Sequence, residues 1–226
     1  MKRLFYLIAL LLASTASFTA CSETDEEEDV KYSNWEARNT AYFDSIMGVA
    51  RTAIAEAKAT YGDDWEDHCD WRLYRTYAQD ASKTGTSSDS IAVQISKRGT
   101  GSGCPIYTDS ARVNYLVRLI PNALSDKEEE QTLGEIVGYT GVSKDSTSIF
   151  SEEFCTPVAV AVSNNLEGIS MALMYMHIGD LWRVYLPCQL GNGTTPTSYI
   201  PAYSTLIYAL ELKAYYHKGT VVPDWR

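Results

Sequence analysis

The chain has 226 residues, of which 45% are hydrophobic and 21% are charged, and its formal net charge is −10 at pH 7. This composition is typical of a globular protein, and the length suffices for one well-packed core with an additional helical segment. The negative charge argues against nucleic acid or anionic lipid as a partner, because both are polyanions that bind basic surfaces.

The N-terminus has the pattern of a bacterial secretory signal. Lys2 and Arg3 precede an uninterrupted apolar run over residues 4–13, and small residues then lead to Cys21. The run is too short to span a bilayer, so residues 1–20 are predicted to be a signal peptide that is removed. The last residues, FTAC, resemble a bacterial lipobox, which implies that Cys21 becomes the lipidated first residue of the mature protein. A plain secreted protein is the alternative.

Residues 21–32 are predicted to be the lipidated cysteine and a solvated tether. Residues 22–29, SETDEEED, contain six acidic residues and no apolar one, so they cannot bury a core of their own. An acidic stretch behind a lipidated cysteine also resembles the export signal of Bacteroidetes surface lipoproteins; a simple spacer is the alternative. Removal of residues 1–20 takes away two basic residues and no acidic one, which changes the formal charge from −10 to −12.

Residues 33–81 are predicted to form a helical segment. One helix face is apolar and consists of Trp35, Tyr42, Ile46, Val49, Ala50, Ala53 and Ala57. Such a face needs a partner, so the segment is predicted to pack against the domain that follows it, or to form a homodimer. His68 and Cys69 stand among acidic residues, but adjacent ligands point in different directions and no second pair has metal-site spacing. A solvated turn is predicted there, and no metal.

The middle of the chain predicts two strands and an insertion. Residues 91–95 alternate between apolar and polar and predict a strand, which the glycine-rich stretch RGTGSG follows. No helix pattern comes after these glycines, which argues against a phosphate-binding loop. Residues 111–119 predict a second strand. Residues 121–148 hold a charged run and four residues that are Gly or Pro, and they predict a surface insertion with a short hairpin near 136–142.

The C-terminal region predicts a helix between strands. Residues 157–162 predict a strand, and residues 168–176 have apolar residues at the spacing of three and four that indicates a short helix. Residues 181–186 alternate and predict a strand that Pro187 ends. In the last strand, residues 204–212, one side is predicted to face the core. This side consists of Leu206, Tyr208, Leu210 and Leu212.

These blocks resemble a known family. GISMALMYMHIGDLWRVYLP, then GNG and YIPAYSTLIYALEL, resembles the C-terminal half of an FK506-binding-protein (FKBP) type peptidyl-prolyl isomerase. The family pattern reads roughly G-W-x-x-A-L-x-x-M-x-x-G-(D/E)-x-W, then I-P-x-x-L-A-Y-G and I-P-x-x-(S/T)-L-x-F-x-V-E-L-L. The resemblance implies an α+β fold over residues 90–216, in which an antiparallel β-sheet wraps a short α-helix, with residues 217–226 as a tail.

The resemblance also implies an apolar pocket. The expected catalytic residues are Tyr115, Phe150, Leu166, Ile169, Ile200 and Tyr208, with the backbone N–H of Leu166 as a hydrogen-bond donor and Ile169 as the floor. The expected substrate-binding residues are Val158, Ser151 and Asn192. Three of these positions depart from the family pattern: Ile169 replaces the usual tryptophan, Ser151 an aspartate and Asn192 a tyrosine.

The activity that the resemblance implies is prolyl isomerisation, or assistance in the folding of exported proteins, without a cofactor. The expected partners are proline-containing peptides or unfolded exported proteins, and the membrane through the lipid anchor. The expected location is the cell envelope, on the periplasmic or the surface face of the outer membrane. The alternative is a non-catalytic envelope lipoprotein that keeps this fold and binds a peptide or a partner, and the three departures favour it.

Four cysteines follow Cys21, at positions 69, 104, 155 and 188. An even number permits disulfides in an oxidising compartment. Cys155 and Cys188 both flank the pocket that the resemblance implies, so a disulfide between these two is the first hypothesis.

Overall fold

The computed structural model describes residues 30–79, 82, 84–141, 150 and 155–225. The chain divides into two compact units, residues 1–33 and 34–226, and every helix and strand named below belongs to the second unit. The predicted signal peptide, the lipidated Cys21 and the acidic run at 22–29 lie outside the described residues. Within the described ranges, no helix is long and apolar enough to cross a bilayer.

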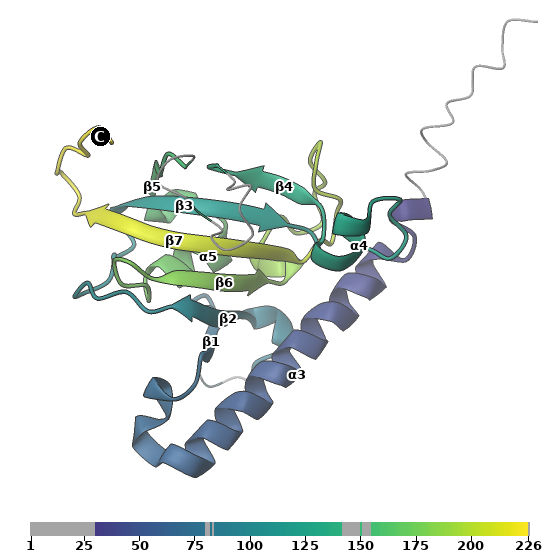
Figure 1. Ribbon diagram of the computed structural model, residues 1–226, viewed down its shortest axis with the longest axis horizontal. Helices are drawn as coiled ribbons and strands as arrows, with labels where there is room; N and C mark the ends of the chain where they lie inside the picture. Colours follow the sequence, from purple (N-terminus) through teal and green to yellow (C-terminus); the bar gives the residue numbers. More distant parts are fainter. Residues whose placement is uncertain (1–29, 80–81, 83, 142–149, 151–154, 226) are drawn as a thin grey trace, which may run out of the picture. The chain divides into compact units, whose positions relative to one another are not determined.

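Seven strands form one antiparallel sheet (Figure 1). They are β1 (Trp71–Arg75), β2 (Ser90–Lys97), β3 (Ser110–Arg118), β4 (Ile136–Tyr139), β5 (Val158–Ala161), β6 (Leu181–Leu186) and β7 (Leu206–Tyr216). The order across the sheet is β1-β2-β6-β7-β3-β4, and β5 also pairs with β3. The last strand, β7, is therefore central, because it lies between β6 and β3 over most of its length.

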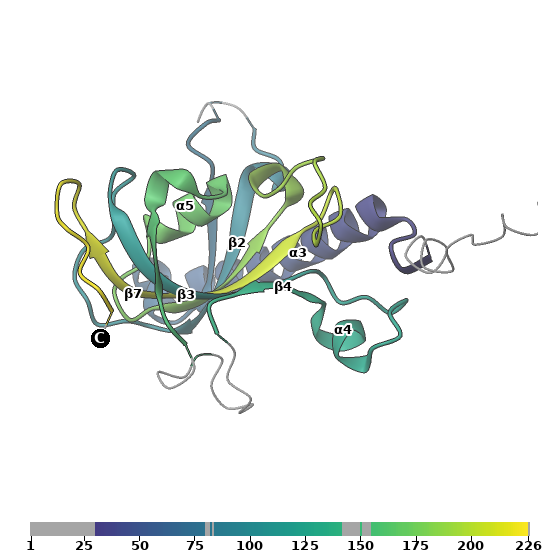
Figure 2. The same ribbon diagram turned by 90° about the horizontal axis from the view of Figure 1, so that it is seen from above.

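Helix α5 (Glu167–Leu173) lies on one face of the sheet and α3 (Trp35–Tyr61) on the other (Figure 2). A Cβ on Gly168 would lie 2.8 Å from Cγ of Leu186 and 3.0 Å from Cγ2 of Ile91. Both of these side chains are fully buried. Glycine therefore lets the backbone of α5 come close to β2 and β6. The predicted α+β architecture, a sheet around a short helix with a helix before it, is confirmed.

Helix α3 packs on the sheet through a small hydrophobic cluster. Phe43 and Met47 of α3 are buried together with Ala92 of β2 and Tyr185 of β6. Neighbouring strand residues point to opposite faces, so Ala92 faces α3 whereas Ile91 faces α5. Of the two roles predicted for the helical segment, the structure shows packing against the following domain. Formation of a homodimer remains a prediction.

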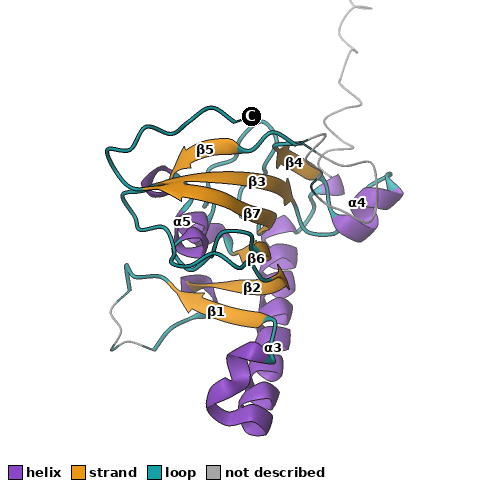
Figure 3. Cartoon of the chain, turned by 60° about the vertical axis from the view of Figure 1, so that its left-hand side comes forward, coloured by secondary structure: helices purple, strands orange, loops and turns teal. Residues whose placement is uncertain are grey.

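Two buried hydrogen bonds hold the start of α3 beside the start of β7. Figure 3 shows α3 crossing behind β6 and β2. The indole N–H of Trp35 donates to the Ser204 hydroxyl at 2.9 Å. The backbone N–H of Thr205 donates to the Asn39 side-chain oxygen at 2.7 Å. Because buried polar groups are costly to leave unpaired, these contacts fix the position of α3 along the sheet as well as its face.

The glycine-rich stretch after β2 packs against the turn between α5 and β6. A Cβ on Gly99 would lie 2.3 Å from the Ile178 carbonyl oxygen, so only glycine permits this approach. The N–H of Gly99 donates to the buried Asp180 carboxylate at 2.6 Å, and the same carboxylate accepts the N–H of His177 at 2.7 Å. Close backbone packing thus accounts for these glycines.

The range predicted as helical, residues 33–81, ends differently in the structure. After α3 comes a 3-10 helix, η1 (Gly62–Asp67), and then strand β1, which pairs with β2. Arg72 hides the strand pattern because it is a charged residue at a buried position. Its guanidinium donates to the carbonyl oxygens of Glu66 at 2.6 Å and Cys69 at 2.7 Å, which satisfies the buried charge locally.

Part of the range predicted as a surface insertion, residues 121–148, belongs to the sheet. It contains α4 (Glu128–Leu133) and β4, and β4 pairs with β3 rather than forming a local hairpin. The Leu119 N–H donates to the Glu135 carbonyl at 2.9 Å at the base of this segment. The acidic run that suggested a solvated loop includes Glu130, which is buried and accepts a hydrogen bond from Ser125 at 2.7 Å.

Substitution Met47→Ala is expected to lower the free energy of unfolding by about 2–4 kcal/mol, because it leaves a cavity between α3 and the sheet. Met47 is 2% exposed, whereas Val49 two residues on is 53% exposed. Val49→Ala is the control and should change the free energy by less than about 0.5 kcal/mol. Urea unfolding followed by circular dichroism measures both. Equal effects of the two variants would contradict the packing of α3 on the sheet.

Candidate active site

A cavity of about 320 Å³ lies between α5 and the strands β3, β4, β5 and β7. Its lining residues are Val113, Tyr115, Val117, Val137, Gly138, Val158, Val160, Asn165, Leu166, Ile169, Leu173, Ile200, Tyr208 and Leu210. Most of these are aliphatic or aromatic, and none carries a charge. The volume lies at the lower end of the range for small-ligand pockets.

The periodicity of each element explains how these side chains converge. In β3, Val113, Tyr115 and Val117 are two residues apart and share one face of the sheet. Val158 and Val160 of β5, and Tyr208 and Leu210 of β7, follow the same rule. Leu166, Ile169 and Leu173 are three and four residues apart, which places them on one side of α5. The helix and the sheet thus each turn one apolar surface into the cavity.

The structure brings six of the nine sequence-predicted site residues to this cavity. These six are Tyr115, Val158, Leu166, Ile169, Ile200 and Tyr208. Phe150 is half-buried and is not among the lining residues, and Asn192 is a half-buried loop residue that also lies outside the lining. Ser151 falls outside the described residues.

Val137 and Gly138 of β4 line the cavity, and sequence reasoning did not place them there. They belong to the range predicted as an insertion, and only the pairing of β4 with β3 brings them to the site. A Cβ on Gly138 would be 3.7 Å from Cε2 of Tyr115 and from Cγ2 of Val117, which is ordinary contact. Gly138 does not have a positive φ. Neither crowding nor backbone strain requires this glycine, so its effect is to leave space in the cavity.

The polar groups of the cavity are neutral. The rings of Tyr115 and Tyr208 lie 6.4 Å apart between centroids, at an angle of 47°. Burial, and to a lesser degree the neighbouring Tyr115, raises the pKa of Tyr208 above its ordinary value, so its hydroxyl remains a hydrogen-bond donor at pH 7. The carbonyl of Leu166 accepts the first hydrogen bonds of α5, from Ile169 and Ser170, which leaves its N–H outside the helical ladder.

This arrangement can enclose a small apolar group and offer it neutral hydrogen-bond donors. Apart from the hydroxyls of Tyr115 and Tyr208, the described side chains that line it include no group of the kind that usually serves as an acid, a base or a nucleophile. In the part of the chain that the structure describes, no group of three or more His, Cys, Asp or Glu side chains is placed to hold a metal ion. The site is therefore suited to stabilising a conformation of a bound molecule by its apolar surroundings.

The family comparison agrees with this site. A model of the FKBP-type peptidyl-prolyl cis-trans isomerase family matches residues 128–213. The match covers less than half of the chain. The matched segment starts at α4, inside the range predicted as an insertion, and runs through β4, β5, α5 and β6 into β7. It includes five of the six predicted residues that line the cavity; Tyr115, on β3, precedes it.

Three solved structures are among those similar to this chain. A peptidyl-prolyl cis-trans isomerase of Pseudomonas syringae is 20% identical with a TM-score of 0.43, over 76% of this chain and 94% of that one. FkpA from Escherichia coli is 18% identical with a TM-score of 0.45, over 93% of this chain and 80% of that one. The structure of the three FKBP domains of wheat FKBP73 is 20% identical with a TM-score of 0.44, over 57% of this chain and 47% of that one. No curated protein sequence matches.

The disulfide hypothesised between Cys155 and Cys188 is wrong, because both residues are free thiols in the structure, as are Cys69 and Cys104. Cys155 is buried just before β5. Cys188 lies in a different place, in a small cavity that it shares with Asn39 and other residues of α3. Neither of the two lines the candidate active site.

Thiol titration of a protein consisting of residues 21–226 with Cys21→Ser should give four reactive thiols after unfolding without reductant. In the folded protein, the buried Cys69 and Cys155 should stay unreactive. Burial raises the pKa of the Cys104 and Cys188 thiols, so they should react more slowly than free cysteine at pH 7 and faster as the pH rises. Fewer than four thiols after unfolding would mean that a disulfide forms.

Proposed function

We propose that this protein is an FKBP-type peptidyl-prolyl isomerase that acts on proline-containing segments of exported proteins. The observation that carries the proposal is the apolar cavity in which Tyr115, Ile169 and Tyr208 converge from β3, α5 and β7. The family match over residues 128–213 supports it, because that segment contains most of the cavity.

The chemistry needs only such a cavity. Rotation about an X-Pro amide is slow because it breaks the partial double bond, with a barrier of about 18–20 kcal/mol. In the twisted transition state the amide loses conjugation and with it much of its charge separation. An apolar site therefore favours the twisted amide over the planar one, which is differential binding of the transition state without proton transfer. No cofactor is required.

Each wall of the cavity has a role in this proposal. Ile169 on α5, 5% exposed, is the floor under the proline ring. Tyr208 and Tyr115 form the aromatic wall, and the neutral hydroxyl of Tyr208 can donate to a peptide carbonyl. The N–H of Leu166 is the second donor and holds the substrate chain in register.

The non-catalytic alternative has specific support as well. The described residues that line the cavity include no charged side chain, and Gly138 leaves an unfilled space beside Tyr115. Asn192 does not reach the lining, and Ile169 is a smaller floor than tryptophan. Each missing stabilising group costs about 1–3 kcal/mol, or roughly one to two powers of ten in rate. A protein with these departures can retain peptide binding after losing most of its rate enhancement.

The proposed location is the cell envelope, through a lipid on Cys21. Its support is the signal-like residues 1–20, the FTAC sequence and the acidic run at 22–29. Two or more acyl chains hold a protein stably on a membrane, whereas one gives only weak binding. On either face of the outer membrane, the protein would meet newly exported chains before they fold.

Cis/trans exchange of an X-Pro tetrapeptide, measured by NMR, tests the activity. With the mature chain, residues 21–226 carrying Cys21→Ser, the exchange rate should rise clearly above background. Gly138→Val fills the free space beside Tyr115 and should lower the catalysed rate at least about tenfold, which corresponds to about 1.4 kcal/mol. The same substitution should raise the melting temperature, because valine is favoured over glycine in a strand.

Tyr139→Val is the matched control, since Tyr139 is the next residue of β4 and is 60% exposed. It should leave the exchange rate unchanged. Absence of exchange above background in the unaltered protein, together with retained binding of the tetrapeptide, would replace the isomerase proposal with the non-catalytic one.

Lipidation is tested by mass spectrometry of the protein from cells. The unaltered chain should begin at residue 21 and carry the mass of acyl chains, and Cys21→Ser should lose that mass and leave the membrane fraction. Globomycin, which blocks lipoprotein signal peptidase, should cause the precursor to accumulate. Processing that is unaffected by globomycin would indicate the plain secreted protein.

A further inference from the structure

Helix α5 borders a second cavity, of about 540 Å³, on another of its sides. Leu166 just before α5, with Ile169 and Leu173 in it, lines the candidate active site. Glu167 and Met171 in α5, with Met174 just after it, line the second cavity. Thr76, Tyr77 and Ala78, which follow β1, and Tyr107, which precedes β3, complete most of the wall. The proposed isomerisation does not use this cavity.

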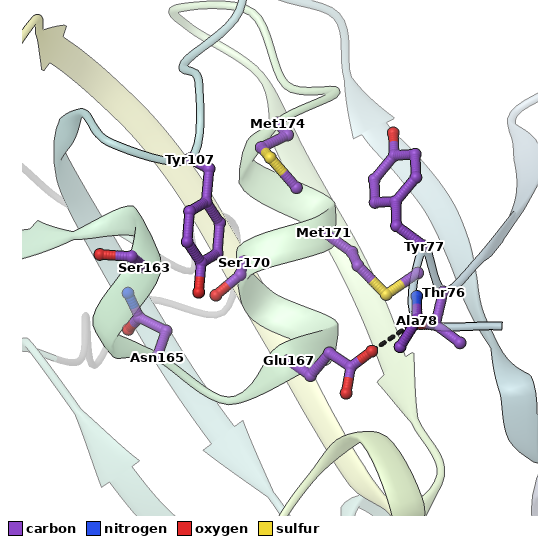
Figure 4. A pocket seen from close by; sticks show the side chains of 10 residues that line it. All are labelled: Thr76, Tyr77, Ala78, Tyr107, Ser163, Asn165, Glu167, Ser170, Met171 and Met174. Carbon is purple, nitrogen blue, oxygen red and sulfur yellow. Dashed lines mark hydrogen bonds between the residues drawn. The ribbon is translucent and has the colours of Figure 1, made fainter.

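The cavity has an adaptable floor between two exposed aromatic walls (Figure 4). Met171 is 2% exposed at the floor, beside Met174, and methionine adapts its shape to different bound groups. Tyr107 and Tyr77 stand on two sides of these methionines and are 56% and 65% exposed. Large tyrosine surfaces exposed to water around an apolar floor are typical of a binding site.

The charge of the cavity points to a cationic ligand. Among the described residues that line it, Glu167 is the one acidic or basic residue. One Glu167 oxygen accepts a hydrogen bond from the Thr76 hydroxyl. The Tyr77 hydroxyl donates a hydrogen bond to the Tyr175 hydroxyl and brings no negative charge to the cavity. The chain as a whole has a net charge of −10, which adds to the repulsion of an anion.

We propose that this cavity binds an extended peptide segment in which lysine or arginine lies next to an aromatic or aliphatic residue. The apolar side chain would pack on Met171 and Met174, and the basic group would pair with Glu167. The hydroxyls of Tyr107 and Ser163 lie along the same wall and can bond to the peptide backbone, whereas the Asn165 amide nitrogen already donates to the Ala161 carbonyl. The ligand class is thus a basic and apolar peptide.

The choice of a peptide rests on the proposed function, because the two cavities adjoin at the start of α5. Asn165 lines both of them. An α-helix with its side chains is about 10 Å wide, so about three to four extended residues at about 3.3 Å each reach from one side to the other. One client chain can therefore place a proline in the candidate active site and a basic segment in the second cavity, which increases its overall affinity.

Fluorescence anisotropy with a labelled proline-free peptide tests the proposal. The probe is Ser-Leu-Phe-Lys-Ser-Gly, its acidic twin has Glu in place of Lys, and the protein is the mature chain with Cys21→Ser. The basic peptide should bind more tightly than the acidic one. Glu167→Gln keeps an acceptor for Thr76 but removes the carboxylate, and it should lower the affinity for the basic peptide about threefold to fivefold. Glu167→Lys should reverse the preference.

Tyr107→Ala removes one aromatic wall and should lower the affinity for the basic peptide about tenfold. The rate of X-Pro exchange should stay unchanged. Tyr199→Ala is the matched control, because Tyr199 is 75% exposed and lines neither cavity, and it should change nothing. Ile200→Ala alters the candidate active site and should leave binding of the proline-free peptide intact.

Equal affinity for the two peptides would overturn the second site. So would loss of peptide binding in Ile200→Ala together with unchanged binding in Tyr107→Ala. The two proposals fail separately. Missing X-Pro exchange with charge-dependent peptide binding would remove the isomerase activity and keep this site, whereas normal exchange without such binding would do the reverse.

Discussion

The close approach of α5 to the sheet is the constraint on which both cavities depend. It exists because residue 168 has no side chain: a Cβ there would lie 2.8 Å from Leu186 and 3.0 Å from Ile91, which are fully buried and cannot move without opening the core. With the helix held at this distance, its neighbouring sides meet different surroundings. One side faces the strands, and another faces the chain before β3 and after β1.

The two sides of α5 differ in chemistry as well as in position. Ile169 and Leu173 face valines and tyrosines from the sheet and enclose an uncharged cavity, in which a neutral, twisted amide would be favoured. Met171 and Met174 lie beside Glu167 in a wider cavity with exposed aromatic walls, where apolar and cationic groups would both be accommodated. Helix α3 closes the opposite face of the sheet, so the sheet below α5 is buried on both faces where α3 covers it.

Local pattern identified those site residues that lie in strands and helices with a clear period. Tyr115 and Tyr208 are in alternating strands, and Ile169 lies on the apolar side of a short helix, so their position followed from the sequence together with the family pattern. The pattern failed at Val137 and Gly138, because β4 is four residues long and lies behind an acidic run. It failed again at β1, where the buried Arg72 interrupts the apolar alternation.

The sequence by itself determined the apolar side of the regularly alternating strands and the helix that precedes the last two of them, since these depend on residues close together in the chain. The α+β class followed from the resemblance to a known family. Only the tertiary structure decided that β4 joins β3, that α3 lies on the sheet, and that Cys155 and Cys188 are apart. It alone showed that a second cavity adjoins α5. These features depend on contacts between residues far apart in the chain, such as Asn39 with Thr205, and no local period records which distant segments meet.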